Sequence, residues 1–441
     1  MSFRLRLPHP LVLLLAGVVV AAVMTWILPA GAYERRMDPR LQREVVVAGT
    51  YARVAAAPVG PMATLIAVPR GIVAGADVIV VILFVGGAFV MLDMTGSLSR
   101  LVGTMVGRTR RPRLLVSGII IVFAILGALE NMQEEFVALV PVLLVLSRGL
   151  GFGAVTAVAM SVGAAAVGSA FGPTNPFQTG IALRFAELPP LSQPALRFGL
   201  MLAAVAVWIA WTLWSLSRDD VKPDVPPVSL ERATTRDSVL LTLAVLPFVP
   251  YVIGVIKWDW GFNELSALFL VAGLAIGLVS GRNLSESAAA FLKGMESLLV
   301  AAMFVGVARA ISVVLTDGKV IDTIVYGLAT PLAHAPSVLA GMLMVPMHAL
   351  IHVPVPSVSG QAALTMPIMA PLSDLLGISR DAAVIAYQTG AGLCELVTPT
   401  NGALLAVLLG AKLDFGRWLK FAIPGALLVA IIGFAGVALA A

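Results

Sequence analysis

Long apolar stretches separated by short polar segments are the main pattern along the chain. A helix needs about 20 apolar residues to cross the hydrocarbon core of a bilayer. Continuous runs close to that length predict spanning helices at residues 10–30, 76–94, 195–216, 238–256, 265–280, 295–315 and 421–440. The pattern predicts an all-α polytopic membrane protein. The polar stretch at about 31–70 is expected to form a short hairpin outside the bilayer.

Four further apolar stretches are interrupted near their middle. Two consist of paired arms around a polar tip: residues 114–129 and 136–146 around 130–135, and residues 337–351 and 362–376 around 354–361. Two are long runs with a proline break, residues 153–185 at 172–176 and residues 382–409 at 398–402. Non-helical backbone at membrane depth is tolerated only inside protein or beside a cavity. We therefore expect two re-entrant hairpins and two broken helices, although the first hairpin could also cross fully.

The interrupted stretches form an internal repeat. With a shift of 226 residues, residues 135–175 align without a gap on 361–401, with 11 identities in 41 positions, and Pro173–Asn175 coincides with Pro399–Asn401. The number of spans between the copies predicts that they run in opposite directions. Carriers built from such inverted repeats bind their solute at the repeat interface, near the midplane, on discontinuous helices.

The repeat also predicts the organisation of the chain into five segments. These are an N-terminal span and outer loop at 1–75, a first repeat at 76–216, a cytoplasmic linker at 217–236, connecting scaffold spans at 237–294 and a second repeat at 295–441. The first repeat holds the hairpin 114–147 and the broken helix 153–185, and the second holds the hairpin 337–376 and the broken helix 382–409.

Composition and charge support a membrane carrier. The chain is 59% hydrophobic and 12% charged, with a net charge of +5. Basic residues gather in short loops such as Arg108–Arg113, a pattern that indicates orientation by the positive-inside rule, with a cytoplasmic N-terminus, and not nucleic-acid binding. We expect the protein in the inner membrane. The first span is expected to be retained, not removed as a signal peptide. The single cysteine, Cys394, excludes a disulfide framework. The absence of a Walker A motif argues against ATP-driven transport.

Carboxylates at the tip of the first hairpin are candidate binding groups. Ionisable residues inside a membrane are costly and point to function. The tip offers these side chains to a substrate ammonium group, a proton or Na⁺: Glu130, Asn131, Glu134 and Glu135. The alternative is that the tip reaches the far surface and is simply solvated.

The helix breaks and the second tip supply uncharged candidates. Asn175 and Asn401 could bind an ion or a carboxylate, or could cap the resumed half-helices, and the two roles are compatible. The other expected substrate-binding residues are Thr174, Thr400, Ser357, Ser359 and Gln361. The hydroxyls of the second tip could instead satisfy their own backbone.

Other titratable residues have competing interpretations. Glu395 is a candidate coupling group together with Glu130, Glu135, Asn175 and Asn401, or it forms a salt bridge with Arg309. Arg309 could bind a carboxylate or only neutralise a glutamate. His348 and His352 share a helix face and are compatible with a metal ion, a proton relay or structural hydrogen bonds. We expect no metal site, with Na⁺ at the tips and breaks as the exception.

Several stretches resemble a known family. Pro356–Pro371, Thr398–Gly402, Asn175–Phe177 and Gly306–Arg309 are similar to the C4-dicarboxylate anaerobic carrier family, and most of all to its YfcC-like branch, assigned to basic amino acid antiport. The resemblance implies the ion-transporter-superfamily fold. It also implies an elevator-type transport domain, a homodimer, and Na⁺ or H⁺ as the coupling ion with no other cofactor. The family often has an acidic residue where this chain has Gly390-Ala391-Gly392, with Glu395 just beyond.

These observations predict an ion-coupled secondary carrier of a small polar metabolite. The substrate is expected to be an amino acid, including a basic one, or a carboxylate, and the acidic first tip favours a substrate with an amine. The alternatives are an exchanger of C4-dicarboxylates or other organic anions, a channel, and an intramembrane enzyme built on Cys394 and His352. Paired hairpins and opposed breaks argue for alternating access and against a continuous pore.

Overall fold

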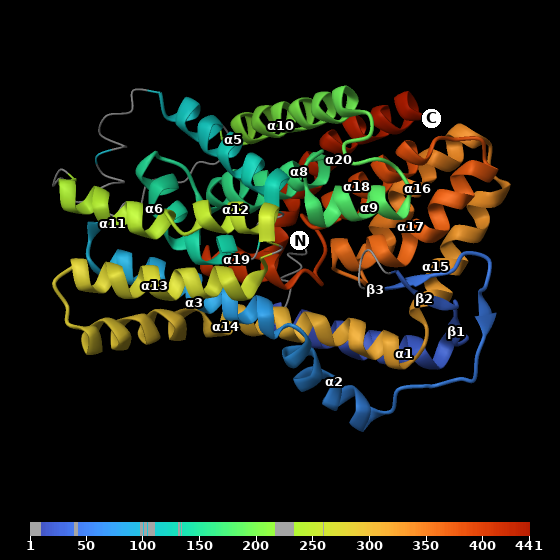
Figure 1. Ribbon diagram of the computed structural model, residues 1–441, viewed down its shortest axis with the longest axis horizontal. Helices are drawn as coiled ribbons and strands as arrows, with labels where there is room; N and C mark the ends of the chain where they lie inside the picture. Colours follow the sequence, from blue (N-terminus) through green and yellow to red (C-terminus); the bar gives the residue numbers. More distant parts are fainter. Residues whose placement is uncertain are drawn as a thin grey trace, which may run out of the picture.

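The computed structural model describes residues 10–38, 43–97, 100, 104, 111–130, 133, 135–216, 233–258 and 260–441. Helices form nearly all of this structure, and the two ends of the chain contribute helices on opposite sides of the bundle (Figure 1). At one side α1 (Pro10–Ile27) packs along the long helix α14 (Leu284–Asp317), and at the other α10 (Pro194–Leu216) packs against α20 (Phe415–Ala440).

The polar stretch after the first helix contains more structure than the sequence pattern predicts. The expected hairpin is present as β2 (Arg35–Asp38) and β3 (Arg43–Val46), and β1 (Gly31–Ala32) pairs with β4 (Ala52–Arg53). However, a helix, α2 (Pro61–Ala74), replaces the loop expected to continue to about residue 70. It begins with proline at its first turn, where the missing N–H is not needed, and packs on α14.

The first repeat contains the predicted hairpin and broken helix. It begins with α3 (Ala76–Met94), and the hairpin consists of α5 (Pro112–Glu130), the 3₁₀ turn η1 (Glu135–Leu139) and α6 (Val140–Gly149). The broken helix consists of α7 (Ala154–Val158), the π-helical turn η2 (Ala159–Gly163) and α8 (Ala164–Phe171), and it resumes as η3 (Pro176–Gly180) and α9 (Ile181–Phe185). The break lies at residues 172–175, as predicted.

The connecting region differs from the expected spans. The single helix predicted at 238–256 is two helices, α11 (Thr235–Val245) and α12 (Phe248–Trp258), because Pro247 cannot continue the helical hydrogen bonds. It is followed by α13 (Phe262–Val279) and by α14, whose 34 residues extend well beyond the predicted 295–315.

The second repeat also has a hairpin and a broken helix. After α15 (Ile321–Ala329) and η4 (Thr330–His334), the hairpin is formed by α16 (Ser337–His352) and α17 (Val358–Leu375). The broken helix is α18 (Arg380–Cys394) followed by α19 (Gly402–Gly410). Corresponding elements pack alike: α5 lies on α8 in the first copy, and α16 lies on α18 in the second. The opposite orientation of the copies remains a prediction.

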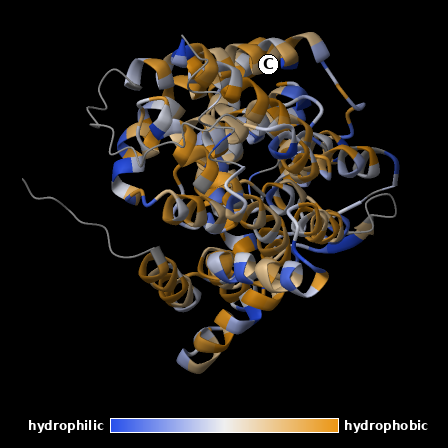
Figure 2. Ribbon diagram, turned by 90° about the vertical axis from the view of Figure 1, so that its left-hand side faces the viewer, coloured by the Kyte–Doolittle hydropathy of each residue, from blue (hydrophilic) through white to orange (hydrophobic). Residues whose placement is uncertain are grey.

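Burial separates central helices from peripheral ones. Seven helices of the described chain are long and apolar enough to cross a membrane. The continuous stretch Ala154–Phe171 is 94% buried, whereas only 28% of the apolar window in α10 is buried. Apolar residues colour most helical ribbons, and hydrophilic residues occur chiefly in the connections (Figure 2). The peripheral helices therefore present the apolar faces expected of lipid contact.

The hairpin arms approach the broken helices at glycines. A Cβ added to Gly168 of α8 would lie 1.9 Å from the carbonyl oxygen of Ala124 on α5, and one added to Gly390 of α18 would lie 2.2 Å from that of Val345 on α16. Small residues at helix interfaces in membranes allow this close backbone contact.

Buried polar groups connect the two repeats. Arg197 of α10 donates to Asp381 and Gln388 of α18, and Gln388 in turn donates to Thr179 of η3. The Nε2 of Gln178 donates back to the carbonyl oxygen of Gln388. Because every partner is away from water, this network holds the two broken helices together.

We expect Gly168→Ala to destabilise the protein by about 2 kcal/mol, because the added methyl group overpacks the contact between α5 and α8. The matched control is Gly118→Ala on α5, where nothing lies within 4 Å of the new Cβ. Thermal unfolding in detergent should show a lower midpoint for Gly168→Ala alone. Equal midpoints for the two variants would contradict the close contact.

A second prediction concerns Asp237 at the start of α11, outside the helices that can cross a membrane. Its carboxylate accepts hydrogen bonds from Arg100 and the backbone of Thr234, and the Arg100 guanidinium holds its pKa well below the usual range. A carboxyl with a lowered pKa stabilises the fold at neutral pH and loses this contribution as the pH falls. Asp237→Asn should therefore cost about 2 kcal/mol at pH 7. The difference between the melting curves of parent and variant should be constant near neutral pH and should shrink as the pH falls below about 4, the ordinary pKa of an aspartate in the unfolded chain; a difference that does not change with pH would contradict the role.

Candidate functional site

A cavity of about 440 Å³ lies where the second hairpin tip meets the second helix break. Its walls come from both repeats and from α2 and α13. It is lined by Ala74, Asp77, Val78, Phe177, Phe262, Val305, Ala308, Arg309, Pro356, Ser357, Val358, Ser359, Gly360, Glu395, Thr400, Asn401, Gly402 and Ala403. A volume of this size accommodates a small metabolite.

Two helix N-termini open into this cavity. Ser357 has an extended backbone and caps α17 by accepting a hydrogen bond from Gly360, and Asn401 caps α19 by accepting one from Leu404. The first residues of both helices, including Ser359 and Gly402, line the cavity. Unpaired N–H groups and the helix dipoles give this wall a positive potential that favours an anion.

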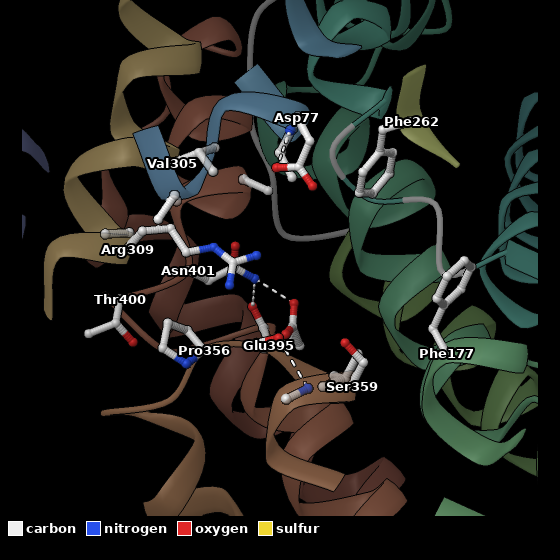
Figure 3. A pocket seen from close by; sticks show the side chains of 18 residues that line it. Asp77, Phe177, Phe262, Val305, Arg309, Pro356, Ser359, Glu395, Thr400 and Asn401 are labelled. Atoms are coloured by element: carbon white, nitrogen blue, oxygen red, sulfur yellow. Dashed lines mark hydrogen bonds between the residues drawn. The ribbon is translucent and has the colours of Figure 1, made fainter. Parts of the chain in front are cut away.

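The cavity contains one cation and two acidic side chains among the described residues. Arg309 of α14 is half-buried and takes part in none of the ion pairs found in the described chain. Figure 3 shows the guanidinium of Arg309 directed toward Asn401 and Glu395. Asp77 lies on a different wall of the cavity, and Phe177 and Phe262 form an aromatic wall across the cavity from Arg309. The arrangement provides charged groups for orientation and aromatic surface for contact.

Glu395 connects the cavity to a buried histidine. It follows the C-terminus of α18, and its Oε1 lies 2.7 Å from Nε2 of His352, the last residue of α16. The Nδ1 of His352 lies 2.8 Å from Oε1 of Gln361 in the first turn of α17. The other oxygen, Oε2, accepts a hydrogen bond of 2.7 Å from Asn401. Histidine 352 is fully buried, whereas Glu395 reaches the cavity wall.

The structure brings together six of the residues predicted for the site. All six belong to the second repeat and line the same cavity: Arg309, Ser357, Ser359, Glu395, Thr400 and Asn401. Gln361 lies directly behind the wall, bonded to His352. The alternative interpretation of Glu395, a salt bridge with Arg309, is not realised: the contact of its carboxyl group is with His352.

The first break has a different setting. Asn175 is fully buried; its Oδ1 caps η3 through Phe177 and Gln178, and its Nδ2 donates to the carbonyl of Gly127 and to Ser169. Thr174 is exposed, and neither residue lines the cavity, to which the first break contributes Phe177. Asn175 therefore has the predicted capping role, and the participation of Thr174 and Asn175 in substrate binding stays a prediction.

The tip of the first hairpin lies largely outside the described residues. This applies to Asn131 and Glu134, and of Glu130 and Glu135 only the backbone is described, at the end of α5 and the start of η1. The turn η1 packs against α3 and α19, both of which contribute to the cavity wall.

Among the wall residues that the sequence did not predict, three have charged or aromatic side chains. Asp77 lies in the first turn of α3, which the sequence predicts as an ordinary spanning helix, and an acidic residue at that position could have indicated a functional role. Phe177 and Phe262 carry no such signal, because aromatic residues are common in apolar helices.

The described residues contain no group of three or more His, Cys, Asp and Glu side chains that could hold a metal ion. His348 and His352 share a face of α16, and the ring of His348 packs edge-on against Tyr387. The Cys394 thiol donates to the carbonyl of Ala349. This cysteine is thus engaged with the backbone.

Known proteins resemble this chain over nearly its whole length. The sequence profile of the C4-dicarboxylate anaerobic carrier family, DcuC, matches residues 7–441. A protein of Escherichia coli named "Putative basic amino acid antiporter YfcC" is 28% identical over 95% of this chain and 93% of its own length. An uncharacterized protein of Haemophilus influenzae is 26% identical over the same shares.

Two solved transporter structures align with almost the whole chain. The YdaH transporter of Alcanivorax borkumensis has a TM-score of 0.46 at 17% identity, covering 98% of both chains. MtrF of Neisseria gonorrhoeae, titled an antimetabolite efflux pump, has a TM-score of 0.44 at 18% identity, covering 98% of this chain and 94% of its own. The sequence matches carry the assignment. The chain is a multi-pass membrane protein that belongs to the C4-dicarboxylate anaerobic carrier (DcuC) family of transporters.

Proposed function

We propose that this protein is an ion-coupled secondary carrier that moves a small carboxylate-bearing metabolite, and specifically an amino acid, across the inner membrane. The observation that carries the proposal is Arg309, an arginine without a carboxylate partner among the described residues, in a cavity that also receives two helix N-termini. A guanidinium and free backbone N–H groups together bind a carboxylate by charge-assisted hydrogen bonds.

Asp77 favours an amino acid as the substrate. It is exposed to the cavity that Arg309 lines, and its carboxylate is available to an ammonium group while Arg309 holds the carboxylate. The relative named as a basic amino acid antiporter supports the same substrate class. A C4-dicarboxylate, the substrate in the family's name, needs a partner for its second carboxylate. No second cation lines the cavity in the part of the chain that the structure describes.

Alternating access is the mechanism that the repeat supports. The two copies share their break positions and the packing of hairpin on broken helix, which is how elevator-type carriers build a transport domain. By the same analogy, the carrier is a homodimer with a cytoplasmic N-terminus. The buried bonds between η3 and α18 fit a domain in which both broken helices move together.

The proposal is tested by uptake into proteoliposomes containing the purified chain. L-arginine, L-lysine, L-alanine and succinate are offered under imposed Na⁺ or H⁺ gradients. A carrier gives saturable uptake driven by one gradient, whereas a channel gives uptake that does not saturate. The absence of saturable uptake of every member of the panel would overturn the proposal.

Arg309→Gln should raise the KM for the transported substrate by about 30-fold, because a charge-assisted pair to the carboxylate is lost. Arg309→Lys should be intermediate, since it keeps the charge and loses the planar fork. The control is Arg113→Gln, which changes an exposed arginine of α5. An unchanged KM in Arg309→Gln, with normal folding, would exclude this residue from the site.

Asp77→Asn should distinguish the two substrate classes. We expect the KM for amino acids to rise about 10-fold or more because the ammonium group loses its counter-charge, with no rise for succinate. Competition against labelled L-arginine measures both. Asp93→Asn, at the other end of α3, serves as the control. Equal effects on amino acids and succinate would show that Asp77 does not bind the amine.

A further inference from the structure

The hydrogen bonds around His352 and Glu395 determine how many protons this pair of side chains holds. The Nε2 of Gln361 donates to the carbonyl oxygen of His348 over 2.8 Å, which turns Oε1 of Gln361 toward Nδ1 of His352. The opposite amide orientation would place two oxygens against each other. Since Oε1 can only accept, Nδ1 of His352 must carry a hydrogen.

The remaining imidazole nitrogen, Nε2, faces Oε1 of Glu395 at 2.7 Å. A hydrogen bond of this length needs one proton between the two atoms, carried either by the carboxyl group or by the imidazole. Without that proton, an imidazole lone pair would face an anionic oxygen at the same distance. The observed geometry is therefore the proton-loaded form of the pair, which is neutral as a whole.

The surrounding groups do not take up this proton. On α16 the Nδ1 of His348 lies 3.4 Å from Gln361, and on α18 the Tyr387 hydroxyl donates to the carbonyl of Val358 and the Cys394 thiol to that of Ala349. The described parts of α8 and α19 contain no titratable residue, and α20 presents the indole of Trp418, bonded to Leu396. Across the cavity stand Arg309 on α14 and Asp77 on α3.

The repeat shows that the break itself does not require this acid. The position equivalent to Glu395 in the first copy is Ser169, 226 residues earlier, and its Oγ accepts the corresponding hydrogen bond from Asn175 over 3.1 Å. The corresponding hairpin arm of the first copy, α5, contains no histidine. A neutral acceptor is sufficient for the fold, so the acid–base pair has been placed in one copy for another reason.

We propose that His352 and Glu395 form the proton site of this carrier, and that proton binding and substrate binding reinforce each other through Arg309. In the loaded form Glu395 is held by His352 and Asn401, and Arg309 is free for the substrate carboxylate. When the proton leaves to water in the cavity, the carboxylate of Glu395 is repelled by the Nε2 lone pair and pairs with Arg309. The substrate carboxylate then loses its partner, so a proton and a substrate molecule travel together.

The inference rests on the proposed function, because it assigns to Arg309 the role of holding the substrate. The first experiment uses proteoliposomes loaded with a pH indicator and given an inward gradient of L-arginine or succinate. Uptake by the parent should acidify the lumen, and its KM should rise about tenfold per pH unit once the pair has lost its proton.

Glu395→Gln reproduces the loaded form at every pH, because its amide can donate to His352 and accept from Asn401. It should exchange labelled for unlabelled substrate with a KM that does not depend on pH, and it should move no protons. Ser169→Ala removes the equivalent contact of the first copy and should retain the pH dependence. Proton movement by Glu395→Gln, or parent uptake driven by Na⁺ alone, would overturn the proposal.

A second measurement needs no substrate and separates this proposal from the proposed function. The chain has four histidines, so selective ¹⁵N labelling resolves their ring signals. The ring signal that is missing from His352→Gln belongs to His352; it should shift when the pair loses its proton, whichever partner carries that proton, and should not depend on pH in Glu395→Gln. If no member of the panel is transported but this signal is present, the proposed function fails and the proton site stands. A His352 ring that titrates identically in Glu395→Gln would overturn the proton site.

Discussion

Every other feature of this protein depends on how its backbone polar groups are satisfied where two helices stop inside an apolar bundle. Each unpaired N–H or C=O in such surroundings costs several kcal/mol. Asn175 and Asn401 cap the resumed helices, and the indole of Trp418 donates to the carbonyl of Leu396 at the second break. The indole of Trp208 donates to the carbonyl of Ala159 in the π-helical turn η2. The breaks are thus stable structural elements that direct helix ends into the protein interior.

The two copies solve this backbone problem alike but differ in chemistry. In each copy the break is tied to the C-terminal part of the first hairpin arm, through Asn175 to the carbonyl of Gly127 and through Thr400 to that of Val353. The first copy completes its cap with a serine, and the second with a glutamate next to a histidine. A symmetric scaffold therefore carries an asymmetric site, whose polar wall comes mostly from the second repeat.

In the proposed carrier, charge placement is the basis of selectivity. Arg309 and the N-termini of α17 and α19 make one wall electropositive, while Asp77 and Glu395 supply negative groups around the same volume. In a low-dielectric interior such groups interact strongly, so a solute with complementary charges displaces water at little cost. The buried Arg197–Asp381 pair, outside the cavity, connects α10 to α18 and keeps the framework of both repeats in place.

The sequence by itself determined the membrane class, the two breaks and the residues of the second tip and break. The length of apolar runs, the positions of prolines and the internal repeat can all be recognised in the sequence alone. The bounds of helix α3, for example, are those that the sequence predicts. Only the tertiary structure decided which candidates meet. Asp77, Arg309 and Glu395 are far apart in sequence, and the partner of Glu395 is His352, not Arg309. Such pairings depend on how the helices pack, and the periodicity of apolar residues does not predict which polar side chains face one another.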